Sequence, residues 1–259
     1  MNCLNCNRKI NIKFKGEKMK TVIVTGGSRG IGAAIVKELA KEKYNLVLNY
    51  NNSEDAAKKI QKELEDQNIK IEIFKADVSK REEVKELVKF ALEKYKNIDV
   101  LINNAGIDQI KPFMDITDED WNKIMQVNLN SVFYCCQEVL ENMIHNKKGC
   151  IINISSIWGR IGASCEVHYS ASKAAIDGLT KALAKEMGPS NIRINSIAPG
   201  IIETEMNKDL SKEDIKEILS QVPLGRIAKP EEIVKSIKWL IEDEYVTGQV
   251  ISVDGGWNI

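Results

Sequence analysis

The sequence predicts one α/β domain, a doubly wound, seven-stranded parallel sheet with helices on both faces. Three observations predict it. Short apolar runs rich in Val and Ile alternate with charged segments of helical period from Lys20 to the C-terminus. A glycine-rich turn at 25–32 separates the first apolar run from the first helical segment. The length of 259 residues suits one large core, and strand–helix alternation favours parallel strands joined by right-handed crossovers.

The first half of the chain contains four predicted strands and three predicted helices. The first strand, 21–25, is a short β-branched run, which indicates a strand buried on both faces. The next strands are expected at 46–48, 69–74 and 100–102. The helices are expected at 31–43, 53–67 and 82–95. Each helix has apolar residues on one face, as Ile31, Ile35 and Leu39 do in the first.

The second half repeats this pattern and then departs from it. The stretch 118–145 is expected to hold two helices, the second of which begins near Val127. Strands are expected at 150–154, 192–197 and 250–253, and a helix rich in small residues at 167–187. The segment 201–224 is polar and has helical period, yet it follows a strand directly. We predict that it forms a mobile lid over a site.

Charge and composition exclude several classes of protein. Lys plus Arg number 37 and Asp plus Glu number 37, and this zero net charge argues against a general binder of nucleic acid or anionic membranes. No run of 18 apolar residues is present, so no transmembrane helix is expected. Four of the six cysteines lie in apolar or helical stretches: Cys135, Cys136, Cys150 and Cys165. This usage is typical of free thiols in a reducing compartment, which predicts a cytoplasmic protein.

The first 18 residues differ from the rest of the chain. They are rich in Asn and Lys and contain no apolar stretch of the kind found in secretory signals. Because Met19 stands directly before the first strand, we interpret 1–18 as a disordered extension or an overcalled start, and 19–259 as the domain. Cys3 and Cys6 form a CxxC pair, but zinc normally needs four ligands and the sequence offers no second pair, so no metal site is expected.

The glycines of the turn at 25–32 predict a phosphate-binding site. Gly26, Gly30 and Gly32 follow a GxxxGxG spacing between the first strand and the first helix. Glycine lets backbone N–H groups approach a pyrophosphate, and the amino end of a helix favours its negative charge. The alternative interpretation is a tight strand-to-helix turn without a ligand. The position after the first strand of an alternating pattern favours a dinucleotide site.

The residues after the second strand favour NADP(H) over NAD(H). An NAD site usually has an acid there for the ribose 2′-hydroxyl. Here the strand ends in Asn49, Tyr50 and Asn51, and the first acid is Glu54. Arg29 in the glycine turn is placed to meet a 2′-phosphate. The kcat/KM values for NADPH and NADH test this expectation.

A serine, a tyrosine and a lysine form the predicted reactive group. Tyr169 and Lys173 are four residues apart in a predicted helix, so they share one face. A nearby ammonium favours the phenolate and is expected to lower the tyrosine pKa, which would ease proton transfer to a carbonyl oxygen. Ser156 ends the fifth strand, at the same edge of the sheet, and would donate a hydrogen bond to the developing oxyanion. Asn128 lies inside a helical stretch, where asparagine is unfavourable; a kink or a satisfied polar contact is the simpler explanation.

Together these motifs resemble the classical short-chain dehydrogenase/reductase family over residues 19–259. The matching segments are TGGSRGIG at 25–32, Asp77-Val78, NNAG at 103–106, Asn128, Ser156, YSASK at 169–173 and Pro199-Gly200. The resemblance implies a single Rossmann-like domain, a catalytic tetrad of Asn128, Ser156, Tyr169 and Lys173, and a homotetramer. It implies a cofactor site made of Gly26, Ser28, Arg29, Gly30, Ile31, Gly32, Asn49, Tyr50, Asn51, Asp77, Val78, Asn104, Ala105, Gly106, Tyr169, Lys173, Pro199, Gly200, Ile202 and Thr204.

Within that family the chain is most similar to bacterial 3-oxoacyl-acyl-carrier-protein reductases of fatty acid synthesis. Two features depart from that group. The residues before the sixth strand, 189–191, lack the basic residue used to dock an acidic carrier, and Lys147 and Lys148 offer a weaker basic patch. The segment 162–168 is instead similar to the elongation factor P 5-aminopentanone reductases, which reduce a ketone that bears an amine.

Two residues near the tyrosine are expected to face substrate. Glu166 lies three residues before Tyr169, and an acid on the pocket rim would favour a cationic ketone over an acidic carrier. A solvated glutamate at a helix start is the simpler interpretation. Trp158 is expected to pack against substrate or lid, or in the core. Other classes that remain open are a non-catalytic NADP-binding regulator and a scaffold protein, although balanced Glu and Lys indicate solvated helix faces.

Overall fold

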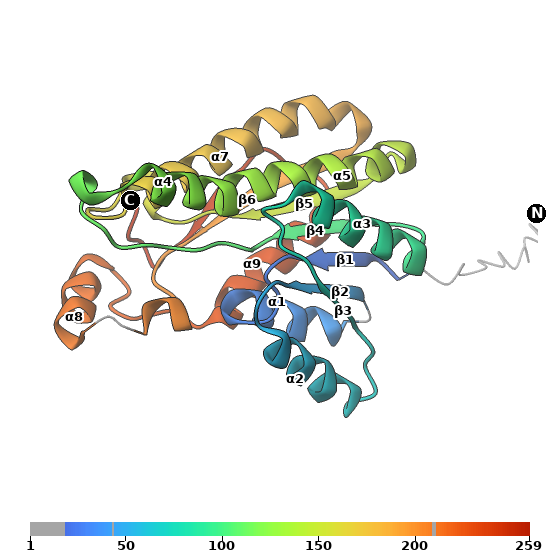
Figure 1. Cartoon of the computed structure of the whole chain (residues 1–259), viewed down its shortest axis with the longest axis horizontal. Helices are drawn as coiled ribbons and strands as arrows, with labels where there is room; N and C mark the ends of the chain where they lie inside the picture. Colours follow the sequence, from blue (N-terminus) through green and yellow to red (C-terminus); the bar gives the residue numbers. More distant parts are fainter. Residues whose placement is uncertain (1–18, 43, 209–210) are drawn as a thin grey trace, which may run out of the picture.

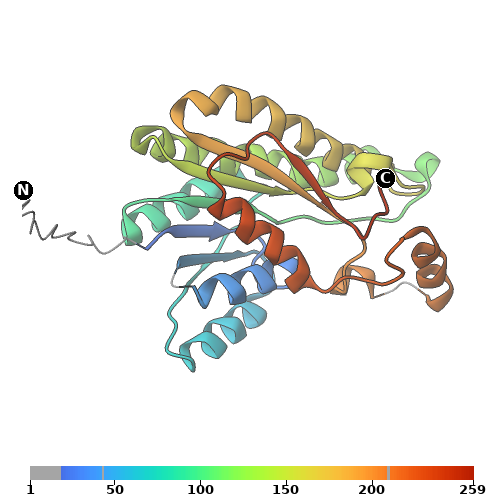
Figure 2. The ribbon, with the colours of Figure 1, turned by 180° about the vertical axis from the view of Figure 1, so that it is seen from behind.

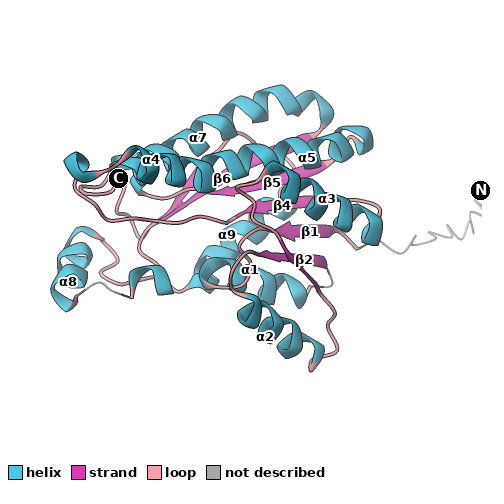
Figure 3. Cartoon of the chain, in the orientation of Figure 1, coloured by secondary structure: helices cyan, strands magenta, loops and turns pink. Residues whose placement is uncertain are grey.

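A seven-stranded, all-parallel sheet with the order β3-β2-β1-β4-β5-β6-β7 forms the centre of the protein (Figure 1). The computed structural model describes residues 19–42, 44–208 and 211–259. The interpretation of 1–18 and the Cys3–Cys6 pair therefore lie outside the described residues. Figure 3 shows the strands as one layer between two layers of helices, which confirms the predicted fold class.

The elements follow the predicted alternation closely. The strands are β1 (Thr21–Val24), β2 (Asn45–Tyr50), β3 (Glu72–Lys75), β4 (Val100–Asn103), β5 (Gly149–Ile154), β6 (Ile192–Pro199) and β7 (Val250–Val253). The helices are α1 (Gly30–Ala40), α2 (Glu54–Glu65), α3 (Arg81–Tyr95), α4 (Asp118–Met125), α5 (Ser131–Asn146), α6 (Trp158–Ile161), α7 (Val167–Met187), α8 (Lys212–Gln221) and α9 (Pro230–Glu242). None of the helices in the described ranges has the length and apolar character needed to cross a membrane.

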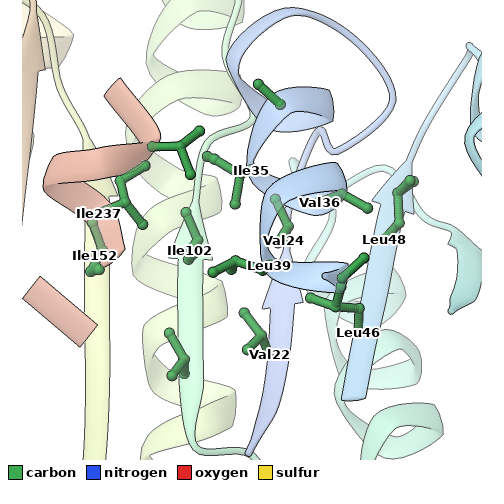
Figure 4. Packing of buried hydrophobic residues seen from close by; sticks show 14 of the residues in the cluster. Val22, Val24, Ile35, Val36, Leu39, Leu46, Leu48, Ile102, Ile152 and Ile237 are labelled. Atoms are coloured by element: carbon green, nitrogen blue, oxygen red, sulfur yellow. The ribbon is translucent and has the colours of Figure 1, made fainter. Parts of the chain in front are cut away.

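The two faces of the sheet carry separate hydrophobic cores. Successive strand residues point to opposite faces, so Val22 and Val24 pack under α1 while Ile23 packs on the other side. Helices α1, α2 and α9 cover the first face, and α3, α5 and α7 cover the second, as the two opposite views show (Figures 1 and 2). Figure 4 shows the first core, where strand residues such as Leu48 and Ile102 surround side chains of α1. This sandwich holds the carboxyl ends of the strands at one edge.

The stretch 118–145 differs from a simple pair of helices. Helices α4 and α5 are joined without a loop by a π-helical turn, Gln126–Asn130, close to the predicted division at Val127. The Ser131 hydroxyl donates to the Val127 carbonyl oxygen at 2.6 Å and satisfies one of the backbone acceptors in this turn. The chain continues as a helix here because no Pro or Gly interrupts it.

Two parts of the second half depart from the sequence-based predictions. Cys165 is not in an apolar or helical stretch: it lies partly exposed in the turn between α6 and α7, with a φ of 61°. Within 201–224, the described residues form a short 3₁₀ turn, Glu205–Asn207, and the exposed helix α8, which stands apart from the sheet in Figure 1. A lid role for this segment stays a prediction.

Candidate active site

The glycine-rich turn lies at the carboxyl edge of the sheet and is tied to the segment after β4. The Thr25 hydroxyl accepts hydrogen bonds from the backbone N–H groups of Asn104 (3.0 Å) and Ala105 (3.1 Å). The Asn104 side-chain amide donates to the carbonyl oxygens of Thr25 and Gly26, each at 3.0 Å. The first strand and NNAG therefore form one rigid unit, although Thr25 and Asn104 are 79 residues apart in sequence.

The side chains at the end of β2 are turned into the protein. Asn49 is buried; its Oδ1 accepts from the Gly26 N–H (3.3 Å) and its Nδ2 donates to the Ala76 carbonyl oxygen (2.9 Å). Tyr50 is buried in the core beneath α1 and α2. Of the three residues predicted here as cofactor ligands, only Asn51 has an exposed side chain. Asn49 thus supports the turn, and Tyr50 the core, through contacts that sequence patterns do not reveal.

The turn itself fits a phosphate group. Gly26 and Gly30 have positive φ values of 61° and 51°, which L side chains rarely adopt. At Gly32 a Cβ atom would collide with the Gly26 carbonyl oxygen and lie 2.5 Å from the Asn104 amide nitrogen. Arg29, the N-cap of α1, makes no side-chain cap, so its side chain leaves the backbone N–H groups of the first turn open to an anion.

Two ion pairs lie near the glycine turn and the end of β2. Arg29 is exposed, and its guanidinium lies 3.0 Å from the Glu205 carboxylate. Between β2 and α2, a stretch that the structure describes completely, Glu54 is the first acid, and it pairs with Lys58 at 2.7 Å. The described stretch between β2 and α2 thus holds no carboxylate before Glu54, and the nearest cation of the glycine turn, Arg29, is paired with Glu205.

The other predicted cofactor residues lie along the same edge. The Asp77 carboxylate accepts from the N–H (3.1 Å) and the hydroxyl (2.6 Å) of Ser79. Val78 is buried in the second core. These contacts fix the loop after β3.

On the far side of the crevice, the loop after β6 completes the edge. The Pro199 carbonyl oxygen accepts from the Ile157 N–H at 2.9 Å, which joins the ends of β5 and β6. A Cβ atom at Gly200 would lie 2.8 Å from the backbone of Asp254. Ile202 is buried, whereas Thr204 is partly exposed beside the glycine turn.

Ser156, Tyr169 and Lys173 converge at this edge. Ser156 follows β5, and the other two occupy successive turns of α7; all three are buried. Ser156 acts on the Tyr169 hydroxyl as a hydrogen-bonding neighbour and lowers the Tyr169 pKa. The Lys173 ammonium donates to the Ile154 carbonyl oxygen at 2.9 Å and lies 5.5 Å from the centre of the Tyr169 ring. The structure thus brings together the three groups that the sequence predicts as reactive.

Burial has the largest effect on the titration of this group. It raises the pKa of Tyr169 well above its usual value; the hydrogen bond from Ser156 opposes this rise, and the charges of Asp108 and Glu166 add to it. Burial lowers the pKa of Lys173 to about 8. For the protein alone the direction of the Tyr169 shift is opposite to the expected depression, because desolvation raises the tyrosine pKa and Ser156 is the group that lowers it. The phenol holds its proton.

Asn128 lies in the π-helical turn and fixes the loop after β4. It is completely buried; its Oδ1 accepts from the Ile107 N–H (2.8 Å) and its Nδ2 donates to the Ile107 carbonyl oxygen (2.9 Å). Nδ2 also approaches the Ser172 hydroxyl at 3.2 Å. A Cβ atom at Gly106 would lie 3.4 Å from both Asn128 Oδ1 and Lys173 Nζ, which shows how close these groups are. Asn128 is thus both a satisfied polar contact and a neighbour of the reactive group.

A pair of acids, Asp108 and Glu166, borders the reactive group, and only Glu166 was expected there from the sequence. Asp108 lies two residues after NNAG and acts on Glu166 at the start of α7, where it raises the Glu166 pKa. Partial burial, reinforced by Asp108, raises the pKa of Glu166 to about 8. The charge of Asp108 also acts on Tyr169 and Lys173. Sequence could not identify Asp108, because its partner is distant in the chain.

Ser155 and Trp158, two further residues after β5, make contacts near the reactive group. The Ser155 hydroxyl donates to the Lys173 carbonyl oxygen at 3.1 Å, so it points away from the crevice as strand alternation predicts. Trp158 is partly exposed and packs edge-on against Trp257, with ring centroids 4.7 Å apart. Among the described residues, no group of three His, Cys, Asp or Glu side chains is arranged to hold a metal ion.

Comparison with known proteins gives one consistent family. A family model described as short chain dehydrogenase matches residues 20–215. A protein of Chlamydia trachomatis named 3-oxoacyl-acyl-carrier-protein reductase FabG is 44% identical over 239 residues, which cover 92% of this chain and 96% of the relative. A protein of the same name from Staphylococcus epidermidis is 38% identical over 239 residues, which cover 92% and 98%.

A solved structure agrees with these relatives. A double mutant of a Serratia marcescens short-chain dehydrogenase/reductase superposes with a TM-score of 0.87 at 34% sequence identity. The match covers 93% of this chain and 98% of that protein.

Proposed function

The chain belongs to the short-chain dehydrogenase family, and we propose that it is an NADPH-dependent reductase of a ketone, with a 3-oxoacyl group on an acyl carrier protein as its first candidate substrate. The observation that carries the reductase proposal is the convergence of Tyr169, Ser156 and Lys173 beside the glycine turn. The names of the relatives support the substrate. A cytoplasmic location and a homotetramer belong to the same proposal.

The residues of the site divide the reaction among them. NADPH, when bound, supplies the hydride that reduces the ketone carbon. The Ser156 hydroxyl donates a hydrogen bond to the ketone oxygen, and the Tyr169 phenol transfers its proton to that oxygen as negative charge develops. The Lys173 ammonium, held by the Ile154 carbonyl oxygen, stabilises the phenolate that remains. Asn128 holds the wall of the site through Ile107.

The cofactor residues form the second part of the proposal. The open N–H groups of α1 would bind the pyrophosphate, and Arg29 the 2′-phosphate once it leaves Glu205. Asp77, Asn104 and Thr204 border the remaining length of the crevice. A direct test is the affinity of the purified chain for NADPH and NADH by protein fluorescence. Tighter binding of NADH would overturn this assignment.

The acid pair favours a second candidate substrate, an amine-bearing ketone on elongation factor P. Asp108 and Glu166 both act on the titration of Tyr169, so they lie near the reactive group. Since the pKa of Glu166 is raised to about 8, the charge of Asp108 is the one that attracts an ammonium and repels an acidic carrier at neutral pH. The position of the basic patch, Lys147 and Lys148, also argues against an acidic carrier. Lys147 and Lys148 precede β5 and so lie at the amino edge of the sheet, opposite to the site in the same chain. They are not placed to guide a carrier to this chain's own crevice.

One assay separates the two candidates. Oxidation of NADPH is followed with acetoacetyl thioesters, with and without acyl carrier protein, and with an amino-ketone of similar length. Preference for the thioester supports the first candidate, and preference for the amino-ketone, lost in Glu166→Gln, supports the second. If neither the thioester nor the amino-ketone causes NADPH oxidation, both candidate substrates are overturned. If no ketone causes it, the non-catalytic regulator is the remaining alternative.

A further inference from the structure

A buried histidine beside Tyr169 takes no part in the proposed mechanism. His168 lies in the first turn of α7 and is completely buried. Its Nε2 lies 2.9 Å from Gln109 Oε1, and its Nδ1 has no hydrogen-bond partner among the described residues. Burial of an unpaired polar atom costs free energy, so an apolar side chain would serve better if packing were the only role. The bond to Gln109 is therefore the feature that needs an explanation.

Gln109 connects the imidazole to a fixed carboxylate. Its Nε2 donates to Asp120 Oδ1 at 2.8 Å, and Asp120 Oδ2 accepts from the Lys111 ammonium at 2.6 Å. Lys111 and Gln109 hold the pKa of Asp120 well below its usual range, so this carboxylate is an acceptor at neutral pH. With its nitrogen facing Asp120, Gln109 presents its oxygen to His168. His168 Nε2 therefore carries the proton and donates it.

The segment 107–111 is held at three points by this arrangement. Asn128 holds Ile107 at one end, and the Lys111 N–H donates to the Cys165 carbonyl oxygen at 2.7 Å at the other. The His168–Gln109 bond holds the middle. Between these points lies Asp108, whose charge acts on the reactive group.

We propose that His168 and Gln109 are positioning residues, which hold the segment 107–111 and its Asp108 at a fixed place beside Tyr169. Neither side chain touches the reacting atoms. The bond joins the residue directly before Tyr169 to the residue directly after Asp108, so its loss lets two neighbours of the ketone shift relative to each other. This proposal rests on the reductase function and adds residues that order the site.

The kinetic test uses His168→Leu, Gln109→Leu, the double variant and His168→Gln. Each Leu variant is expected to lower kcat for ketone reduction by about tenfold to a hundredfold, since small misplacements of reacting groups have effects of this size. The Kd for NADPH should stay unchanged, because the glycine turn makes no contact with this bond. His168→Gln keeps an N–H donor and should restore most of kcat. His145→Leu, at the exposed end of α5, is the matched control.

The double variant shows whether the two residues act together. If His168 acts through Gln109, the double variant should be no slower than the slower single variant. The proposal would be overturned if the losses of kcat in the two single variants multiply in the double variant, or if kcat is unchanged in His168→Leu. It would also be overturned if kcat falls only in variants whose melting temperature is lower.

A second readout does not depend on activity. The sequence has only two histidines, so ¹⁵N spectra of imidazole-labelled protein contain two ring systems, and His145→Leu assigns them. His168 is expected as the Nε2–H tautomer with a slowly exchanging proton, which exchanges faster in Gln109→Leu. A fast-exchanging proton or the other tautomer would overturn the inferred bond. If no ketone is reduced, the reductase proposal fails, while these spectra still report on the bond.

Discussion

The phenol of Tyr169 is the residue on which the reductase chemistry depends. Its burial favours the protonated form, which suits a group that gives a proton to a ketone oxygen. Tyr169→Phe removes that proton and little volume. We expect kcat to fall by about a hundredfold to ten-thousandfold, the usual contribution of a general acid, with an unchanged Kd for NADPH. Steady-state kinetics and fluorescence titration measure the two quantities.

A suitable control for this variant is Tyr245→Phe. Tyr245 is 99% exposed in the loop before β7, so its hydroxyl has no neighbour in the site. Both kcat and the melting temperature should remain at the wild-type value. Retention of kcat in Tyr169→Phe would contradict the assignment of the proton donor.

Glu166 gives the stability a predictable dependence on pH. Its pKa is raised to about 8 in the folded chain, first by burial and then by Asp108. In the unfolded chain this carboxyl ionises near pH 4.5, so the unfolded chain becomes more stable relative to the folded chain as pH rises from about 4.5 to about 8. The contribution of Glu166 is therefore fully present below that window and lost across it. Glu166→Gln should be the more stable protein at pH 8 but not at pH 4.5.

Urea midpoints at several pH values check this prediction. The comparison of wild type with Glu166→Gln removes the parallel effects of other groups, including the buried Lys173. Glu186→Gln, an exposed position on the same helix, serves as the control. Equal pH profiles for wild type and Glu166→Gln would show that Glu166 is ionised in the fold.

At the scale of elements, the glycine turn at 25–32 depends on the absence of a side chain at Gly32. A Cβ atom at Gly32 would collide with the Gly26 carbonyl oxygen and crowd Asn104. Gly32→Ala is therefore expected to destabilise the fold by about 1–3 kcal/mol, the usual cost of overpacking, and to weaken NADPH binding at least tenfold. Thermal unfolding and fluorescence titration measure both effects.

Gly178→Ala is the matched substitution inside a helix. Gly178 lies in the middle of α7, where a Cβ atom would meet nothing within 4 Å. Alanine is the better helix former, so the fold should gain roughly 0.5–1 kcal/mol, with NADPH binding unchanged. Similar behaviour of the two variants would show that the glycines of the turn are not sterically required.

The periodicity of the sequence predicted the seven strands and most of the helices that the structure describes. Strand 250–253 and helix 167–187 have the predicted bounds, because each is a clean apolar run or a continuous helical pattern between breakers. The helix α9 was missed, since it follows an irregular segment that hides its start at Pro230. The π-helical turn at 126–130 also has no signature in local propensity; only its position near Asn128 marks it.

The sequence predicted those site residues whose side chains are themselves proposed to react. Tyr169, Lys173 and Ser156 meet as their spacing predicts. Asn49 acts instead as a support for the glycine turn, and Asp108 as a partner of Glu166. Both roles arise from contacts between distant parts of the chain, and the burial that reverses the expected tyrosine pKa arises in the same way.

At the scale of the whole molecule, three buried cysteines report on the two cores. Cys150 belongs to the core under α1 and α9, whereas Cys135 and Cys136 belong to the core under α3 and α5. Burial raises the pKa of all three thiols, that of Cys136 to about 12, so they should resist alkylation in the native state. Among the four cysteines in the described ranges, partly exposed Cys165 should react before the other three.

Alkylation along a urea gradient, read by peptide mass spectrometry, tests whether the two cores unfold together. Because both pack on the same sheet, all three buried thiols should become reactive at one urea concentration. Labelling of Cys150 well before Cys135 and Cys136 would show that the faces separate independently.

The central place of β1 in the sheet has a consequence for how the protein is made. Its register partners are β2 on one side and β4 on the other, and Thr25 receives hydrogen bonds from Asn104, 79 residues further along the chain. During synthesis the glycine turn leaves the ribosome early, but its second wall arrives only after the polypeptide has grown past β4. The nascent turn therefore stays incomplete until then, and a dinucleotide cannot template the early steps of folding.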